Sequence, residues 1–218
     1  MMKTKINPIQ FISLKNLNRY KKINSLLIDV LKYQYRYHVI NQLLIKCPVK
    51  TKERPIFLKP YIEALEHANS KIVSLIEVHN FEVDGGTLSK IFKLCAKTDA
   101  IRFVDVTFSS LQDFTLQDTD YNIKELSLSY CKNKDGDSDL NILKAMFNKI
   151  CESEAMRSSL DFINFESNLI IENEYDELLE EFESRSNITL QTPNLDKILK
   201  DSDEIILARS LTEEDKDR

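Results

Sequence analysis

Residues 101–111 read IRFVDVTFSSL and residues 123–131 read IKELSLSYC, and the two runs share one spacing. Apolar or small side chains recur at the first, fourth, sixth and ninth positions, namely Ile101, Val104, Val106 and Ser109 in the first run and Ile123, Leu126, Leu128 and Cys131 in the second. Each run has the length of one strand, and a single unit of this kind cannot bury its apolar side alone. The shared spacing therefore predicts a stack of repeated units.

The same spacing recurs on both sides of these runs. Upstream it is occupied by Val73, Ile76, Val78, Phe81 and Val83, and downstream by Leu160, Ile163, Phe165, Asn168 and Ile170. Weaker copies follow at Ile188 and Leu190 and at Ile205 and Leu207. The first three steps between units are about 28, 22 and 37 residues long, so the array is irregular.

The spacing resembles the LxxLxLxxN/C motif of the leucine-rich-repeat family. The resemblance implies an α/β solenoid with short parallel strands on the concave side and helices on the convex side. It also implies a non-catalytic protein-interaction module. An ordinary α/β sandwich is the alternative fold.

Helical periodicity and turn residues divide the chain into segments. We expect a helical, basic segment over residues 1–47, a linker over 48–59, a repeat domain over 60–208 and a charged tail over 209–218. Within the repeat domain, helices are predicted over residues 61–69, 87–97, 140–152, 173–184 and 194–200. The segment at 1–47 would form an N-terminal helical cap on the first repeat.

The composition is that of a folded protein, with 42% hydrophobic and 30% charged residues in 218. The four cysteines, Cys47, Cys95, Cys131 and Cys151, form no CxxC pair and are interpreted as reduced thiols of an intracellular protein. No apolar run reaches the roughly 18 residues of a membrane-spanning helix. We therefore expect a cytoplasmic or nuclear protein. A mitochondrial protein is the alternative, because the first 28 residues hold six basic residues and no acid.

Charge is distributed unevenly along the chain, whose net charge is −5. Residues 1–60 hold 13 basic and two acidic residues, whereas the rest of the chain holds 17 basic and 33 acidic residues. The two parts either complement each other within one fold or provide a basic anchor for an acidic partner.

The sequence holds no motif that predicts catalysis, a cofactor or a metal. The loop at 131–139 resembles a calcium loop, but Cys131 and Ile142 stand where carboxylates are required. Residues 84–87, DGGT, lack the lysine of a phosphate-binding loop, and the three histidines are isolated. Nucleic-acid binding by the aromatic and basic residues at 32–38 is not predicted, because a helix would spread them around its surface.

Residues 11–28, FISLKNLNRYKKINSLLI, resemble the middle of an F-box. The resemblance implies binding to a Skp-type adaptor of a cullin ubiquitin ligase, with contacts from Leu14, Leu17, Ile23, Leu26 and Leu27. The alternative is that the same residues only cap the repeats.

The repeat frame assigns side chains between the inward positions to the concave face. This assignment places acidic and aromatic groups together as a partner-binding surface, made of Phe103, Asp105, Phe108, Tyr130, Glu77, Glu125 and Phe162. The leading functional prediction is a substrate-recruiting subunit of a ubiquitin ligase. The alternative is a structural subunit of a large organellar or cytoskeletal assembly that uses its basic N-terminus as an anchor.

Overall fold

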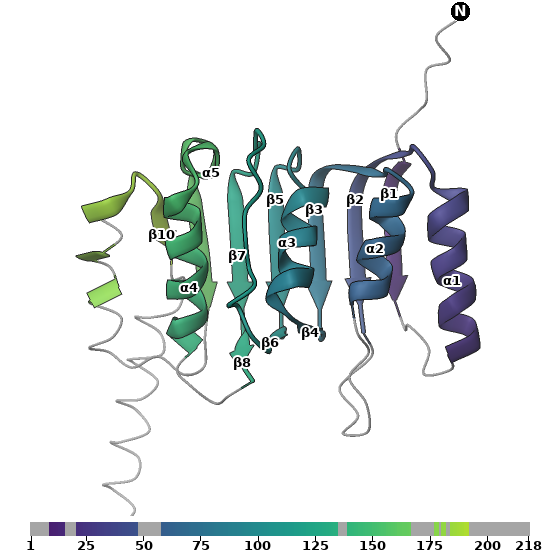
Figure 1. Ribbon diagram of the computed structural model, residues 1–218, viewed down its shortest axis with the longest axis horizontal. Helices are drawn as coiled ribbons and strands as arrows, with labels where there is room; N and C mark the ends of the chain where they lie inside the picture. The colour runs from purple at the N-terminus through teal and green to yellow at the C-terminus, as the bar shows by residue number, and fades with distance from the viewer. Residues whose placement is uncertain are drawn as a thin grey trace, which may run out of the picture.

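The computed structural model describes residues 9–15, 21–47, 58–134, 139–166, 177–178, 180–181 and 184–191. The chain has an α/β fold built around a sheet of seven strands. The strands are β1 (Ile9–Lys15), β2 (Val39–Lys46), β3 (Lys71–His79), β5 (Ala100–Val104), β7 (Glu125–Ser129), β9 (Phe162–Glu166) and β10 (Thr189–Gln191). They lie side by side in chain order, and every neighbouring pair is parallel (Figure 1).

The helices are α1 (Lys21–Gln34), α2 (Lys59–His67), α3 (Gly85–Leu94), α4 (Asp139–Glu152) and α5 (Glu154–Ser159). Figure 1 shows α2, α3 and α4 on the same face of the sheet. Between β5 and β7 the described chain has no helix, and the buried Phe114 packs against Phe92 of α3, with ring centroids 5.3 Å apart. None of the described helices is long and apolar enough to cross a membrane.

The core lies between the sheet and the helices. Because side chains alternate along a strand, two positions of each strand face this core and the residues between them face the other side. Strand pairing aligns the core positions into two rows, the first of Ile12, Leu43, Ile76, Ile101, Leu126 and Ile163, and the second of Ile45, Val78, Phe103, Leu128 and Phe165. All of these side chains are buried.

Three units turn the chain in the same way after the main strand. Asn80, Asp105 and Tyr130 each adopt a positive φ, at 61°, 53° and 55°. The backbone N–H of each donates to a carbonyl of the next unit, over 2.7–3.1 Å. The turns lead into the short strands β4 (Glu82–Val83), β6 (Thr107–Phe108) and β8 (Lys132–Asn133), which form a second parallel sheet.

Buried hydroxyl groups link successive units at the other end of the strands. Ser70, Thr98 and Ser159 donate hydrogen bonds to the carbonyl oxygens of Tyr35, Ile72 and Ile123, at 3.0, 2.8 and 2.7 Å. Each hydroxyl thus satisfies a backbone carbonyl of an earlier unit as well as its own donor. This recurring contact was not predicted from the sequence.

The N-terminal prediction was wrong. Residues 1–47 do not form a helical cap, because the described part of this segment is strand β1, helix α1 and strand β2. β1 pairs in parallel with β2, and β2 with β3, so the segment extends the main sheet. Residues 9–15 are extended because their backbone partners come from residues 40–46, which helical periodicity within the segment does not reveal.

The helices predicted at 61–69, 87–97 and 140–152 are confirmed as α2, α3 and α4, with small shifts of their ends. Pro60 stands in the first turn of α2, and the Asp84 carboxylate caps α3 by accepting from the Thr87 N–H at 2.6 Å. Helix α5 was not predicted. The predicted linker except Leu58 and Lys59, most of the 173–184 helix, the 194–200 helix, the copy at 205–207 and the tail at 209–218 lie outside the described residues.

Candidate functional site

The candidate site is the sheet face opposite α2, α3 and α4, which we call the open face. Strand register places three rows of side chains on it. The first row holds Gln42, Leu75, Ala100, Glu125, Phe162 and Thr189; the second holds Leu44, Glu77, Arg102, Ser127 and Asn164; the third holds Lys46, His79, Val104, Ser129 and Glu166. Most of these side chains are half-buried, and they mix charged groups with aliphatic ones.

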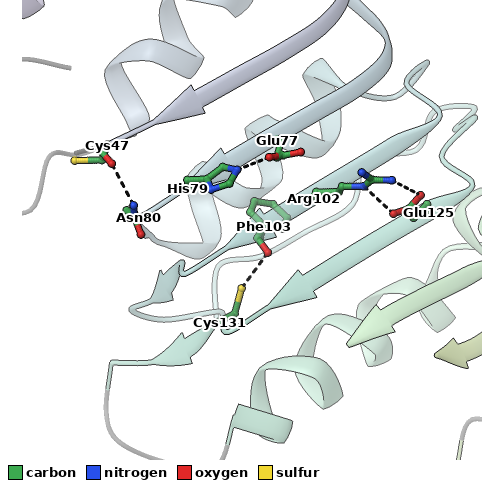
Figure 2. A network of polar contacts seen from close by, with 8 residues as sticks. All are labelled: Cys47, Glu77, His79, Asn80, Arg102, Phe103, Glu125 and Cys131. Carbon is green, nitrogen blue, oxygen red and sulfur yellow. Dashed lines mark hydrogen bonds and ion pairs between the residues drawn. The ribbon is translucent and has the colours of Figure 1, made fainter. Parts of the chain in front are cut away.

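An ionic cluster occupies the middle of the open face (Figure 2). Arg102 of β5 donates from Nε and Nη2 to the two carboxylate oxygens of Glu125 on β7, at 2.9 and 3.1 Å. On β3, the Glu77 carboxylate and the His79 ring lie within hydrogen-bonding distance of each other. The hydrogen bond to Glu125 raises the pKa of Arg102, and the negative charges of Glu125 and Glu77 add to the effect.

A second polar pair lies where the open face meets the turns. The Tyr130 hydroxyl donates to the Glu166 carboxylate of β9, and Tyr130 itself occupies one of the positive-φ turns. This hydrogen bond raises the pKa of Tyr130, as do the negative charges of Glu166 and Asp105. Side-chain contacts, as well as backbone hydrogen bonds, thus join neighbouring units where the open face meets the turns.

The turn between strand and second sheet also depends on local polar contacts. The Asn80 side chain donates from Nδ2 to the Cys47 carbonyl at 3.2 Å, and Cys131 places Sγ 3.6 Å from the Phe103 carbonyl (Figure 2). Cys131 is buried. These contacts hold the turns in place. The turns in turn set where each strand, and so each row of open-face residues, ends.

The open-face position predicted for Phe103 and Phe108 was wrong. Both side chains are buried, with 0% and 1% exposure, and their rings pack edge to face at 5.7 Å. In this unit the core is formed by Ile101, Phe103, Val106 and Phe108, so the predicted frame was displaced by three residues. With the correct frame, the units starting at 76, 101 and 126 are 25 residues apart.

Asp105 was also misplaced, because it belongs to a positive-φ turn and not to the centre of the sheet face. Glu77, Glu125 and Phe162 lie in the open-face rows as predicted, and Tyr130 lies beside them at the turn. The residue that the sequence analysis missed is Arg102, which occupies the central position assigned to Asp105. Aligning Phe103 with Val78 and Leu128 would have identified it.

The five residues predicted to bind an adaptor do not form one surface in the described chain. Leu14 lies in β1, in register with the buried Ile45, and Leu17 lies outside the described residues. Ile23, Leu26 and Leu27 lie on α1. Leu26 is 66% exposed, whereas Leu27 packs against the core.

Within the described ranges, no three His, Cys, Asp or Glu residues are grouped so that they could hold a metal ion. The open face combines ion-paired side chains with apolar ones, such as Leu75 and Val104. Comparison of the chain with models of protein families, with curated proteins and with solved structures finds no match.

Proposed function

We propose that the chain is a non-catalytic protein-interaction module, a solenoid of leucine-rich-repeat type that binds a partner on its open face. The sequential parallel strands and the repeated turns at Asn80, Asp105 and Tyr130 support the solenoid interpretation. The main observation in support of this function is that the side chains of the open face are aligned in rows. The rows align half-exposed charged and apolar side chains over five strands, from β2 to β9.

The charges of this face favour a partner segment with basic groups. From β3 to β9 the open-face rows contain three carboxylates, those of Glu77, Glu125 and Glu166, and one arginine, Arg102. Asp105 adds an exposed carboxylate at the adjacent turn. Aliphatic and aromatic side chains, Leu75, Val104 and Phe162, lie between them. Such a surface combines charge complementarity, which gives specificity, with apolar area that gives affinity.

The test uses two matched serine-to-arginine variants of the full chain. Ser129 faces the open side between Val104 and Glu166, whereas Ser158 is exposed on α5. We expect quantitative affinity capture to recover the same partner with the wild type and with Ser158→Arg, and to lose it with Ser129→Arg. A set of bound proteins that does not depend on Ser129 would contradict the proposal.

A ubiquitin-ligase role is the more specific candidate, and the exposure of Leu26 is the observation that favours it. Leu26→Asp leaves the core intact, so it tests adaptor binding without unfolding the chain. Co-expression with a Skp-type adaptor followed by size-exclusion chromatography should give a co-eluting complex that Leu26→Asp abolishes. Absence of a complex with the folded wild type would favour the structural-subunit alternative.

A further inference from the structure

The two edges of the main sheet are open among the described residues and complementary to each other. β1 pairs there only with β2, and β10 only with β9. All strands run parallel and in chain order, so the two edges lie at opposite ends of the sheet (Figure 1). The pairing that joins β9 to β10 could therefore join β10 of one molecule to β1 of another.

Backbone direction supports this pairing. At the start of three strands, the N–H groups of Glu125, Phe162 and Thr189 donate to carbonyls of the preceding unit, at 3.1, 3.2 and 3.0 Å. Register places Phe11 in the same row as these residues, and N–H direction alternates along a strand. The N–H groups of Phe11 and Ser13 therefore point away from β2, toward the open edge of β1.

Charge distinguishes the two ends. The elements β1, α1 and β2 contain five basic residues and one acid, Asp29. The described residues from 153 to 191 contain six acids and two basic residues, Arg157 and Arg185. Because the strands follow chain order, the charge asymmetry of the sequence becomes a positive end and a negative end of the sheet.

We propose that the chain associates with a second copy of itself head to tail, with the β10 edge at the acidic end of one molecule on the β1 edge at the basic end of the next. The two surfaces differ, so the contact is heterologous and leaves one edge open at each end of the dimer. Further copies can therefore add. Backbone hydrogen bonds provide the contact, and the opposite charges orient it.

The first experiment measures the mean mass of the full chain by sedimentation velocity as concentration rises, at low and at high salt. We expect the mass to exceed the 25.4 kDa of one chain progressively, and the association to weaken roughly tenfold between about 50 mM and 500 mM NaCl as the charges are screened. A mass that stays at 25.4 kDa throughout the concentration range overturns the proposal.

Two proline variants test the pairing itself. Ser13→Pro removes an N–H from the open edge of β1, and Leu190→Pro removes one from the open edge of β10. Each variant alone should be monomeric, but their equimolar mixture should form one-to-one dimers, because each retains the edge that the other lacks. Dimers of either variant alone would show a symmetric contact and overturn the head-to-tail arrangement.

A charge variant keeps the test independent of proline effects on folding. Lys15→Glu reverses a charge at the end of β1, and Lys132→Glu makes the same change in β8, in the middle of the array. Circular dichroism should show both variants folded, with self-association weakened by Lys15→Glu only. If both variants associate equally, the charges do not orient the contact. The proposal that the basic end of one molecule binds the acidic end of the next would then be overturned.

Discussion

At the scale of single residues, burial decides which side chains are available for binding. Phe103 and Phe108 have the aromatic character of a binding surface, yet both lie in the core and contact each other. Arg102, the neighbouring residue of β5, lies half-buried on the open face as part of the ionic cluster. Substitutions at adjacent positions of β5 should therefore have opposite consequences for stability and for binding.

Phe103→Ala should lower the free energy of unfolding by about 3–5 kcal/mol, because it leaves a cavity among Val78, Leu128 and Phe108. Val104→Ala, on the half-buried open face, should cost about 1 kcal/mol or less. Urea unfolding monitored by circular dichroism measures both. Similar values for the two variants would show that the frame described for β5 is incorrect.

Thiol reactivity reports on the same core. Burial raises the pKa of Cys95 to about 12, whereas Cys151 is only half-buried and its pKa is raised less far. Since the thiolate is the reactive form, Ellman's reagent at pH 8 should modify Cys151 first and Cys95 only on unfolding. Cys151→Ser should remove the fast phase; a fast phase that persists in this variant would point to another accessible thiol.

The raised pKa of Cys95 also gives a pH dependence with a defined sign. A folded-state pKa above the unfolded value of 9.0 means that the folded protein holds the proton more tightly. This contribution to stability is fully present below pH 9 and is lost as the pH rises through about 12.

At the scale of elements, the join between α3 and the following irregular segment depends on one glycine. The Gly85 N–H donates to the Ser110 carbonyl at 2.7 Å, and a Cβ at Gly85 would lie 2.6 Å from the Phe114 backbone nitrogen. The segment that replaces a helix between β6 and β7 thus passes directly over the start of α3. Gly86, the next residue, has no such contact, since its nearest neighbour would lie at 3.7 Å.

Gly85→Ala should therefore destabilise the protein by about 1–3 kcal/mol, because the backbone at 113–114 must move. Gly86→Ala is the matched control and should be neutral or stabilising by up to about 1 kcal/mol, because alanine favours the helix. Thermal unfolding of both variants measures the difference. Equal effects would mean that the segment at 110–114 does not contact Gly85.

At the scale of the whole molecule, each unit contacts mainly its neighbours, so local stability should vary along the array. Amide hydrogen exchange followed by mass spectrometry should show the slowest exchange in β5 and β7, which lie near the middle of the sheet. β10, at an edge and only three residues long, should exchange fastest among the main strands. Uniform exchange across the sheet would indicate one cooperative unit.

The sequence by itself determined the α/β class, the buried pairs Ile76 and Val78, Leu126 and Leu128, and Ile163 and Phe165, and the helices α2, α3 and α4. In these strands the spacing of apolar residues was sufficient, because it fitted only one assignment of the repeat positions. In residues 101–108, apolar side chains at 101, 103, 104, 106 and 108 fit two frames, and only pairing with β3 and β7 selects one.

Tertiary structure alone decided the N-terminal part of the chain. Residues 9–15 carry apolar side chains that suit a helix or a strand, and their strand hydrogen bonds come from β2, about 30 residues away in sequence. The same pairing placed the basic residues at one end of the sheet and the acidic residues at the other. Local spacing cannot encode such contacts, because their partners become neighbours only when the sheet has formed.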